Sequence, residues 1–110
     1  MPVRRLDVAL NDFSPDEMTW CRARITALRI MLPALDPVLH SLIRAMAIER
    51  QPGGTYPEQL TLPLEDASVG ELELAVDLLT QLANAAREEK QPGPAKLIDA
   101  LVGEVRDALA

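Results

Sequence analysis

Apolar residues recur three and four positions apart in four segments of the chain, the spacing that places side chains on one side of a helix. The segments span about residues 15–31, 37–50, 67–89 and 94–109. Runs rich in proline and glycine separate them and end each helix. The short breaks after the first and third segments predict two antiparallel hairpins. We therefore expect an all-α or nearly all-α four-helix bundle, with residues 1–110 forming a single domain.

Two of these helices have strong start signals. Ser14 precedes Pro15 and is followed three residues later by Glu17, and Ser68 is followed in the same way by Glu71. A serine with a glutamate three positions later is typical of a capping box, in which each side chain bonds the backbone N–H near the other residue. We expect these serines to cap the two helices.

Two short segments alternate apolar and other residues with a period of two, which predicts strands. Residues 3–10 carry Leu6, Val8 and Leu10, and residues 59–64 carry three further leucines at alternate positions. Pro63 limits the second segment to a sheet edge. Pairing of these segments with one another is one interpretation, and pairing of residues 3–10 across a dimer is another.

The helices at 15–31 and 67–89 have more apolar surface than one neighbour can cover. In the first, a stripe containing Met18, Cys21, Ile25 and Leu28 is accompanied by a second stripe of Trp20, Ala23, Ala27, Ile30 and Met31. In the second, Leu74 and Leu78 widen the main stripe. We expect a homodimer whose interface draws on one of these helices, with candidate residues Met18, Trp20, Cys21, Ile25, Leu28, Leu74, Leu78 and Leu82.

The charge and the cysteine content indicate which binding partners and which cellular compartment the sequence favours. The net charge of −6 argues against nonspecific binding to nucleic acid or to an anionic membrane. A single cysteine allows no intrachain disulfide and fits a reducing compartment. The chain has no apolar run near the ~18 residues of a membrane span, and its first ten residues do not resemble a signal peptide. We expect a cytoplasmic protein with no membrane partner.

Residues that carry catalysis are scarce. The chain has one histidine, His40, and one cysteine, Cys21. A metal site of the usual kind needs several such ligands. A nucleophilic Cys–His pair would need the side chains of Cys21 and His40 to lie next to each other. The spacing predicts Cys21 on an apolar stripe and His40 on a polar one. We expect no catalytic residues, no metal site and no cofactor.

The first fifty residues resemble ribbon-helix-helix DNA-binding proteins. A short strand precedes two helices, and the phrase Ser41-Leu42-Ile43-Arg44-Ala45-Met46 is similar to the start of that family's second helix. The resemblance implies that strands from two copies pair and enter the major groove of DNA. Arg5 would then face the bases. Arg22 and Arg29, which share one side of the helix at 15–31, complete the candidate nucleic-acid contacts. Asp7 and Ala9 depart from the pattern because they are poor groups for recognising bases.

Taken together, these features favour a small non-catalytic protein–protein interaction module: an adaptor, a chaperone, an inhibitor or an accessory subunit. Its partner would be another protein chain, either a second copy or a foreign one, bound through apolar residues with charges around them. The alternative is a DNA-binding regulator or antitoxin of the ribbon-helix-helix type.

Overall fold

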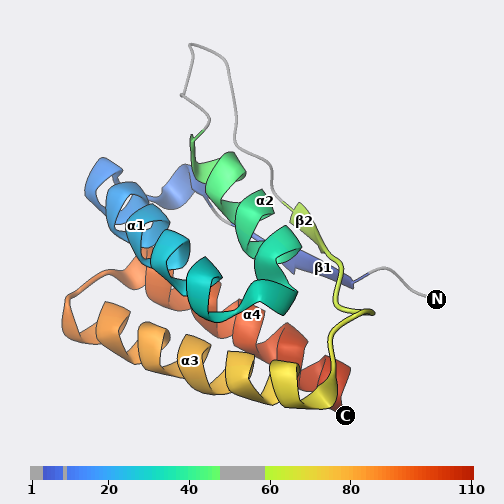
Figure 1. Cartoon of the computed structure of the whole chain (residues 1–110). Coiled ribbons are helices and arrows are strands. Elements are labelled where there is room, and N and C mark those ends of the chain that lie inside the picture. The colour runs from blue at the N-terminus through green and yellow to red at the C-terminus, as the bar shows by residue number, and fades with distance from the viewer. Residues whose placement is uncertain (1–3, 9, 48–58) are drawn as a thin grey trace.

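The computed structural model describes residues 4–8, 10–47 and 59–110 (Figure 1). Its two strands are β1 (Arg4–Asp7) and β2 (Gln59–Leu62), and single 3-10 turns lie at Leu10–Asp12 and Pro33–Leu35. Four helices make up most of the chain: α1 (Pro15–Met31), α2 (Asp36–Ala47), α3 (Val69–Glu88) and α4 (Pro92–Leu109). The expected helical bundle of two hairpins with short strands is confirmed.

The helix starts agree with the sequence in part. Both capping boxes form, with Ser14 and Glu17 at the start of α1 and Ser68 and Glu71 at the start of α3. Because Ser68 is the cap, α3 begins at Val69 rather than at residue 67. Helix α4 begins two residues earlier than predicted, since Pro92 suits the first helical position. Residues 48–50, predicted as the end of the second helix, lie outside the described residues.

The two strands pair with each other inside one chain. They run antiparallel, with Arg4 opposite Leu62 and Leu6 opposite Leu60. Both strands are shorter than predicted, with the side chain of Leu6 buried and that of Arg5 exposed. The ribbon-helix-helix resemblance implies pairing between two copies of the first strand. Here β1 pairs instead with β2, which follows it by more than fifty residues.

Helix α4 packs against α3, α1 and β1, whereas α2 packs against α1 and β2. The apolar side of α4 is buried from Pro94 to Val105, and its most extensive contact is with α3. The core is aliphatic, as expected from a chain with three aromatic residues, of which Phe13 and Trp20 pack at its boundary. Helices α1 and α3 approach each other less closely than either approaches α4, and Figure 1 shows both of them in front of it.

The turn between α3 and α4 contains the one described non-glycine residue with a positive φ angle. Lys90 has φ 58°. Around it, the N–H of Gln91 donates to the carbonyl of Ala86 at 2.8 Å, and the N–H of Lys90 donates to the carbonyl of Arg87 at 3.2 Å. These two bonds form a Schellman motif, which ends the helix and reverses the chain. The left-handed position usually belongs to glycine, because a Cβ atom there clashes with the backbone.

We predict that Lys90→Gly raises the free energy of unfolding by about 1 kcal/mol, since glycine adopts this conformation without strain. Lys90→Ala is the matched control, because it removes the same side chain but keeps the Cβ atom. Urea unfolding followed by circular dichroism measures both. Equal stability of the two variants would contradict this explanation.

Candidate functional site

The structure divides the candidate interface residues into two groups. Cys21, Ile25 and Leu28 are buried in the core of the chain, with exposures of 0%, 1% and 7%. They are unavailable to a partner unless the chain opens. The others reach the surface: Leu74 is 47% exposed, and the remaining four are half-buried against the core, namely Met18, Trp20, Leu78 and Leu82.

The lone thiol is held in its protonated form. Burial raises the pKa of Cys21 to about 12, so a nucleophilic thiolate is disfavoured at neutral pH. His40 is exposed on α2. Within the part of the chain that the structure describes, no three His, Cys, Asp or Glu side chains cluster in a way that would hold a metal ion.

The second apolar stripe of α1 forms an exposed surface. Successive residues of a helix lie 100° apart, so its five members fall within an arc of about 100° that, from Trp20 onward, contains no polar residue. Ile30 is 85% exposed and Met31 57% exposed, and Ala23 and Ala27 are exposed as well. The signal was present in the sequence as this second stripe. Of its members, only Trp20 was among the predicted interface residues.

An arc of α3 lies beside this stripe. Leu74, Leu78, Leu82 and Ala85 fall within about 80° of one another around α3. The contact between Arg24 and Glu89 shows that these two sides lie near each other at the end of α3: Arg24 Nη2 lies 3.6 Å from Glu89 Oε2. The same guanidinium stacks 5.5 Å from the centre of the Trp20 ring. We call the combined surface the α1–α3 face, made of Trp20, Ala23, Ala27, Ile30, Met31, Leu74, Leu78, Leu82 and Ala85.

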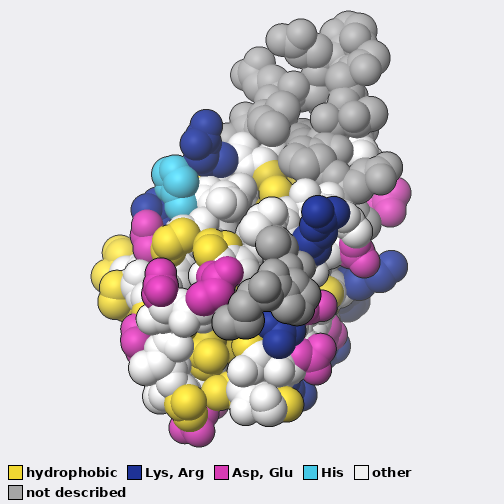
Figure 2. All heavy atoms as spheres, turned by 90° about the vertical axis from the view of Figure 1, so that its right-hand side faces the viewer, with side chains coloured by type: hydrophobic (Ala, Val, Ile, Leu, Met, Phe, Trp, Pro, Cys, Tyr) yellow, Lys and Arg dark blue, Asp and Glu magenta, His cyan; other side chains and the backbone are white. Residues whose placement is uncertain are grey.

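The end of the molecule where α1 ends and α3 begins is shown in Figure 2. Apolar atoms are exposed there in several places, and acidic side chains lie between them. Val69, at 63% exposure, also belongs to this end, but it lies on the side of α3 away from α1. Exposure of large apolar side chains near charged ones is typical of protein-binding surfaces.

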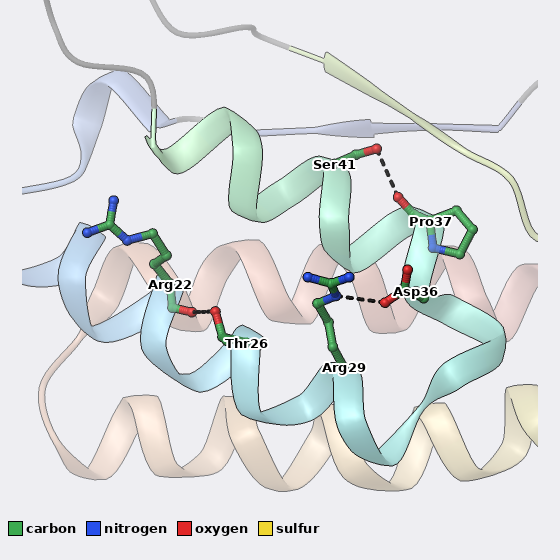
Figure 3. Close-up of polar contacts among 6 residues, drawn as sticks. All are labelled: Arg22, Thr26, Arg29, Asp36, Pro37 and Ser41. Carbon is green, nitrogen blue, oxygen red and sulfur yellow. Dashed lines mark hydrogen bonds and ion pairs between the residues drawn. The ribbon is translucent and has the colours of Figure 1, made fainter.

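The charges beside the α1–α3 face differ between its two helices. On the side of α3 away from α1 lie three exposed acidic residues, Glu73, Asp77 and Glu88. On the corresponding side of α1 lies Arg22, whose side chain points away from α3 in Figure 3. Its neighbour Arg29 is neutralised within the chain, because its Nε donates to Asp36 at 2.7 Å. This bond raises the pKa of Arg29 and lowers that of Asp36.

The three candidate nucleic-acid contacts are not brought together. Arg5 lies on β1, opposite Thr61 of β2, whereas Arg22 and Arg29 lie on α1. Figure 1 places the strand pair behind α2 and α1 in front. Arg29 also has its guanidinium bound by Asp36. The three arginines therefore do not form a single basic surface.

A second candidate site is an open cleft of about 920 Å³ where α4 begins. Phe13, Glu17, Gly93 and Lys96 are among the residues that line it. Glu17 is already engaged there: its Oε1 accepts the N–H of Ser14 at 3.0 Å, and its Oε2 accepts the N–H of Gly93 at 2.6 Å. These backbone donors lower the pKa of Glu17, mainly through Ser14. The carboxylate stays ionised and joins the starts of two helices, so it is not a proton donor.

The position of Gly93 follows from this contact. Pro92 and Pro94 have no N–H, so among the first three residues of α4 only Gly93 has a backbone donor, and Glu17 accepts from it. A Cβ atom at Gly93 would lie 2.6 Å from Glu17 Oε2 and 2.9 Å from a ring carbon of Phe13. Any larger residue at this position would force the side chain of Glu17 or Phe13 to shift.

No helix among the described residues combines the length and the apolar character needed to cross a bilayer. Comparison with known proteins gives no matching family model, no matching curated protein and no matching solved structure. The functional argument consequently depends on the α1–α3 face and on the charges beside it.

We predict that Glu17→Gln lowers the free energy of unfolding at pH 7 by about 1–2 kcal/mol, because an amide can accept only one of the two N–H bonds. Because the pKa of Glu17 is lowered in the folded protein, its carboxylate stabilises the fold at pH values above the ordinary pKa of 4.5. That stabilisation is lost as the pH falls through the lowered pKa. The difference between wild type and variant should therefore be complete above about pH 5.5 and shrink below 4.5.

Glu71→Gln is the control for this measurement. Glu71 occupies the same capping-box position in α3 and its pKa is also lowered, by Ser68. Its carboxylate bonds the N–H of Ser68, its own helix cap, so its replacement should cost less. Urea titrations of the three proteins at pH 7 and pH 3 test the prediction. Equal losses for the two variants at pH 7 would contradict the role of the α1–α4 contact.

We also predict that Gly93→Ala destabilises the protein by about 1–3 kcal/mol through overpacking against Phe13 and Glu17. Gly103→Ala is the control in the same helix. Nothing lies within 4 Å of a Cβ atom there, so this variant should gain up to about 1 kcal/mol from helix propensity. Thermal unfolding of both variants should show Tm shifts of opposite sign, and two upward shifts would contradict the account.

Proposed function

We propose that this chain is a non-catalytic protein–protein interaction module of the cytoplasm, acting as an adaptor, a small chaperone, an inhibitor or an accessory subunit. The observation that supports the proposal is the exposure of Ile30, Met31 and Leu74 on neighbouring sides of α1 and α3. A reduced, buried Cys21 is consistent with a cytoplasmic location.

The energetics require the whole face to take part. Ile30, Met31 and Leu74 retain 85%, 57% and 47% of their exposure. At about 2 kcal/mol for each fully buried side chain, covering them contributes about 4 kcal/mol. Association costs about 4 kcal/mol at the least. The half-buried leucines and the exposed alanines must therefore also pack against the partner for stable binding.

The shape of the face suits a helix. Ala23 and Ala27 on α1 and Ala85 on α3 are small, so a partner helix can approach both backbones between the larger side chains at the ends. Helix-in-groove recognition uses such a surface, with anchors spaced three and four residues apart. A binding partner therefore needs an amphipathic helix or a surface of two helices.

Two matched alanine substitutions test the proposal. Ala27 lies within the face and Ala100 lies on α4 outside it, and both are exposed positions in the interior of a helix. Ala100 also lines the cleft where α4 begins, so loss of binding in Ala100→Asp would point to that cleft instead. Ala27→Asp and Ala100→Asp therefore carry the same propensity cost. We predict that Ala27→Asp abolishes binding and that Ala100→Asp preserves it, because only the first charge would lose its water on association.

The measurement is copurification from the natural host with the tagged full chain, followed by identification of every chain recovered, untagged copies included. A stoichiometric chain retained by wild type and Ala100→Asp and lost from Ala27→Asp supports the proposal. Equal recovery by all three baits, or none at all, contradicts it. A labelled duplex that is bound at low salt and lost on Arg5→Ala would instead favour the ribbon-helix-helix alternative.

A further inference from the structure

We infer that the α1–α3 face binds a second copy of this chain, with α1 of each copy packed on α3 of the other about a two-fold axis that runs along the helices. The inference rests on the proposed function and specifies its partner. In a two-fold interface each copy contributes the same surface patch. That patch must therefore be complementary to a second copy of itself. The charges of this face meet that condition in one arrangement only.

Two ways of pairing are open to a face made of two adjacent helices. An axis across the helices places α1 on α1 and α3 on α3. The direction along each helix is reversed in the second copy, so the acidic strip formed by Glu73, Asp77 and Glu88 lies along the same strip of the other copy. Like charges facing each other across an interface disfavour that arrangement.

An axis along the helices gives the opposite result. Each α1 then lies over the partner's α3, and the basic side of one meets the acidic side of the other. Rotation about this axis keeps every residue at its level along the helices. Arg24 reaches Glu89 within one chain, and α1 and α3 run in opposite directions (Figure 1). Arg22 therefore lies about three residues, roughly 4.5 Å along the helices, from the level of Glu88, a separation that its long side chain can span. Arg22 of each copy is therefore placed near Glu88 of the other, and charge complementarity favours this dimer.

The apolar residues match in the same arrangement. Ala27 of α1 comes to the level of Ala85 of α3, so small residues meet at the centre and allow the backbones to approach. Ile30 and Met31, which have the largest exposures on α1, extend past this centre toward the half of α3 that carries Leu74 and Leu78. The surface that the chain leaves uncovered is thereby covered on both copies at once.

Cysteine cross-linking tests both the partner and the arrangement. The natural thiol, Cys21, is fully buried and does not interfere. Ala27→Cys and Ala85→Cys are prepared as separate proteins, mixed, allowed to exchange subunits and treated with a short bismaleimide. Light scattering of the untreated wild type gives the mass, expected at twice the 12.1 kDa of one chain. We predict that the mixture cross-links and that each variant alone does not.

Other outcomes overturn the inference in distinguishable ways. Cross-linking of Ala27→Cys alone would show α1 on α1. A dimer that cross-links in no combination would use another surface. A monomer at every concentration would exclude a second copy, and the copurification result would then decide separately whether a foreign chain binds the face and the proposed function survives.

A charge exchange gives a second readout that does not depend on the linker. Arg22→Glu should raise the dissociation constant of the dimer roughly threefold to tenfold, because two contacts per dimer are affected. Glu88→Arg should act in the same direction. The double variant Arg22→Glu/Glu88→Arg should return toward the wild-type value, whereas additive losses in the double variant would contradict the pairing.

Discussion

The contact of Glu17 with Gly93 is the interaction on which the arrangement of this molecule depends. One carboxylate accepts the N–H of Ser14 at the start of α1 and the N–H of Gly93 at the start of α4. Pro92 and Pro94 have no backbone N–H, so the start of α4 has few N–H groups that need an acceptor. Gly93 has no side chain, so Phe13 and Glu17 can approach its backbone closely. The contact fixes α1 on α4. Because α3 is fixed on α4 by its own tight turn, α1 and α3 are held near each other without covering each other.

The apolar α1–α3 face is a consequence of that arrangement. Each helix buries one stripe against the core and retains a second arc that the described elements cover only in part. A domain of this size has a small core, and leaving Ile30 and Met31 in water lowers its stability relative to a fold that buries them. We propose that binding to a second copy restores this burial, with Arg22 and the acidic residues of α3 selecting how the two copies align.

Much of the fold could be predicted from the sequence, because it depends on local signals. The capping boxes at Ser14 and Ser68 and the apolar spacing of the helices need no tertiary information. The candidate site was harder to predict. Periodicity shows that α1 has two apolar stripes, but it cannot show which one faces the core, and Cys21, Ile25 and Leu28 proved to be buried. The contacts of Glu17 with Gly93 and of Arg24 with Glu89 join distant residues, and the left-handed Lys90 lacks the usual glycine. None of these has a signature in the local sequence.

The central claim is that the α1–α3 face is covered in solution by a second copy. Methyl NMR with a soluble paramagnetic probe tests it most directly, because the probe relaxes only the methyl groups that it can reach. Val69 is an internal reference, since it is exposed on α3, the helix of Leu74, but lies outside the α1–α3 face. The account predicts that Ile30, Met31 and Leu74 become protected as the protein concentration rises while Val69 stays accessible. Equal accessibility of all four at every concentration would contradict it.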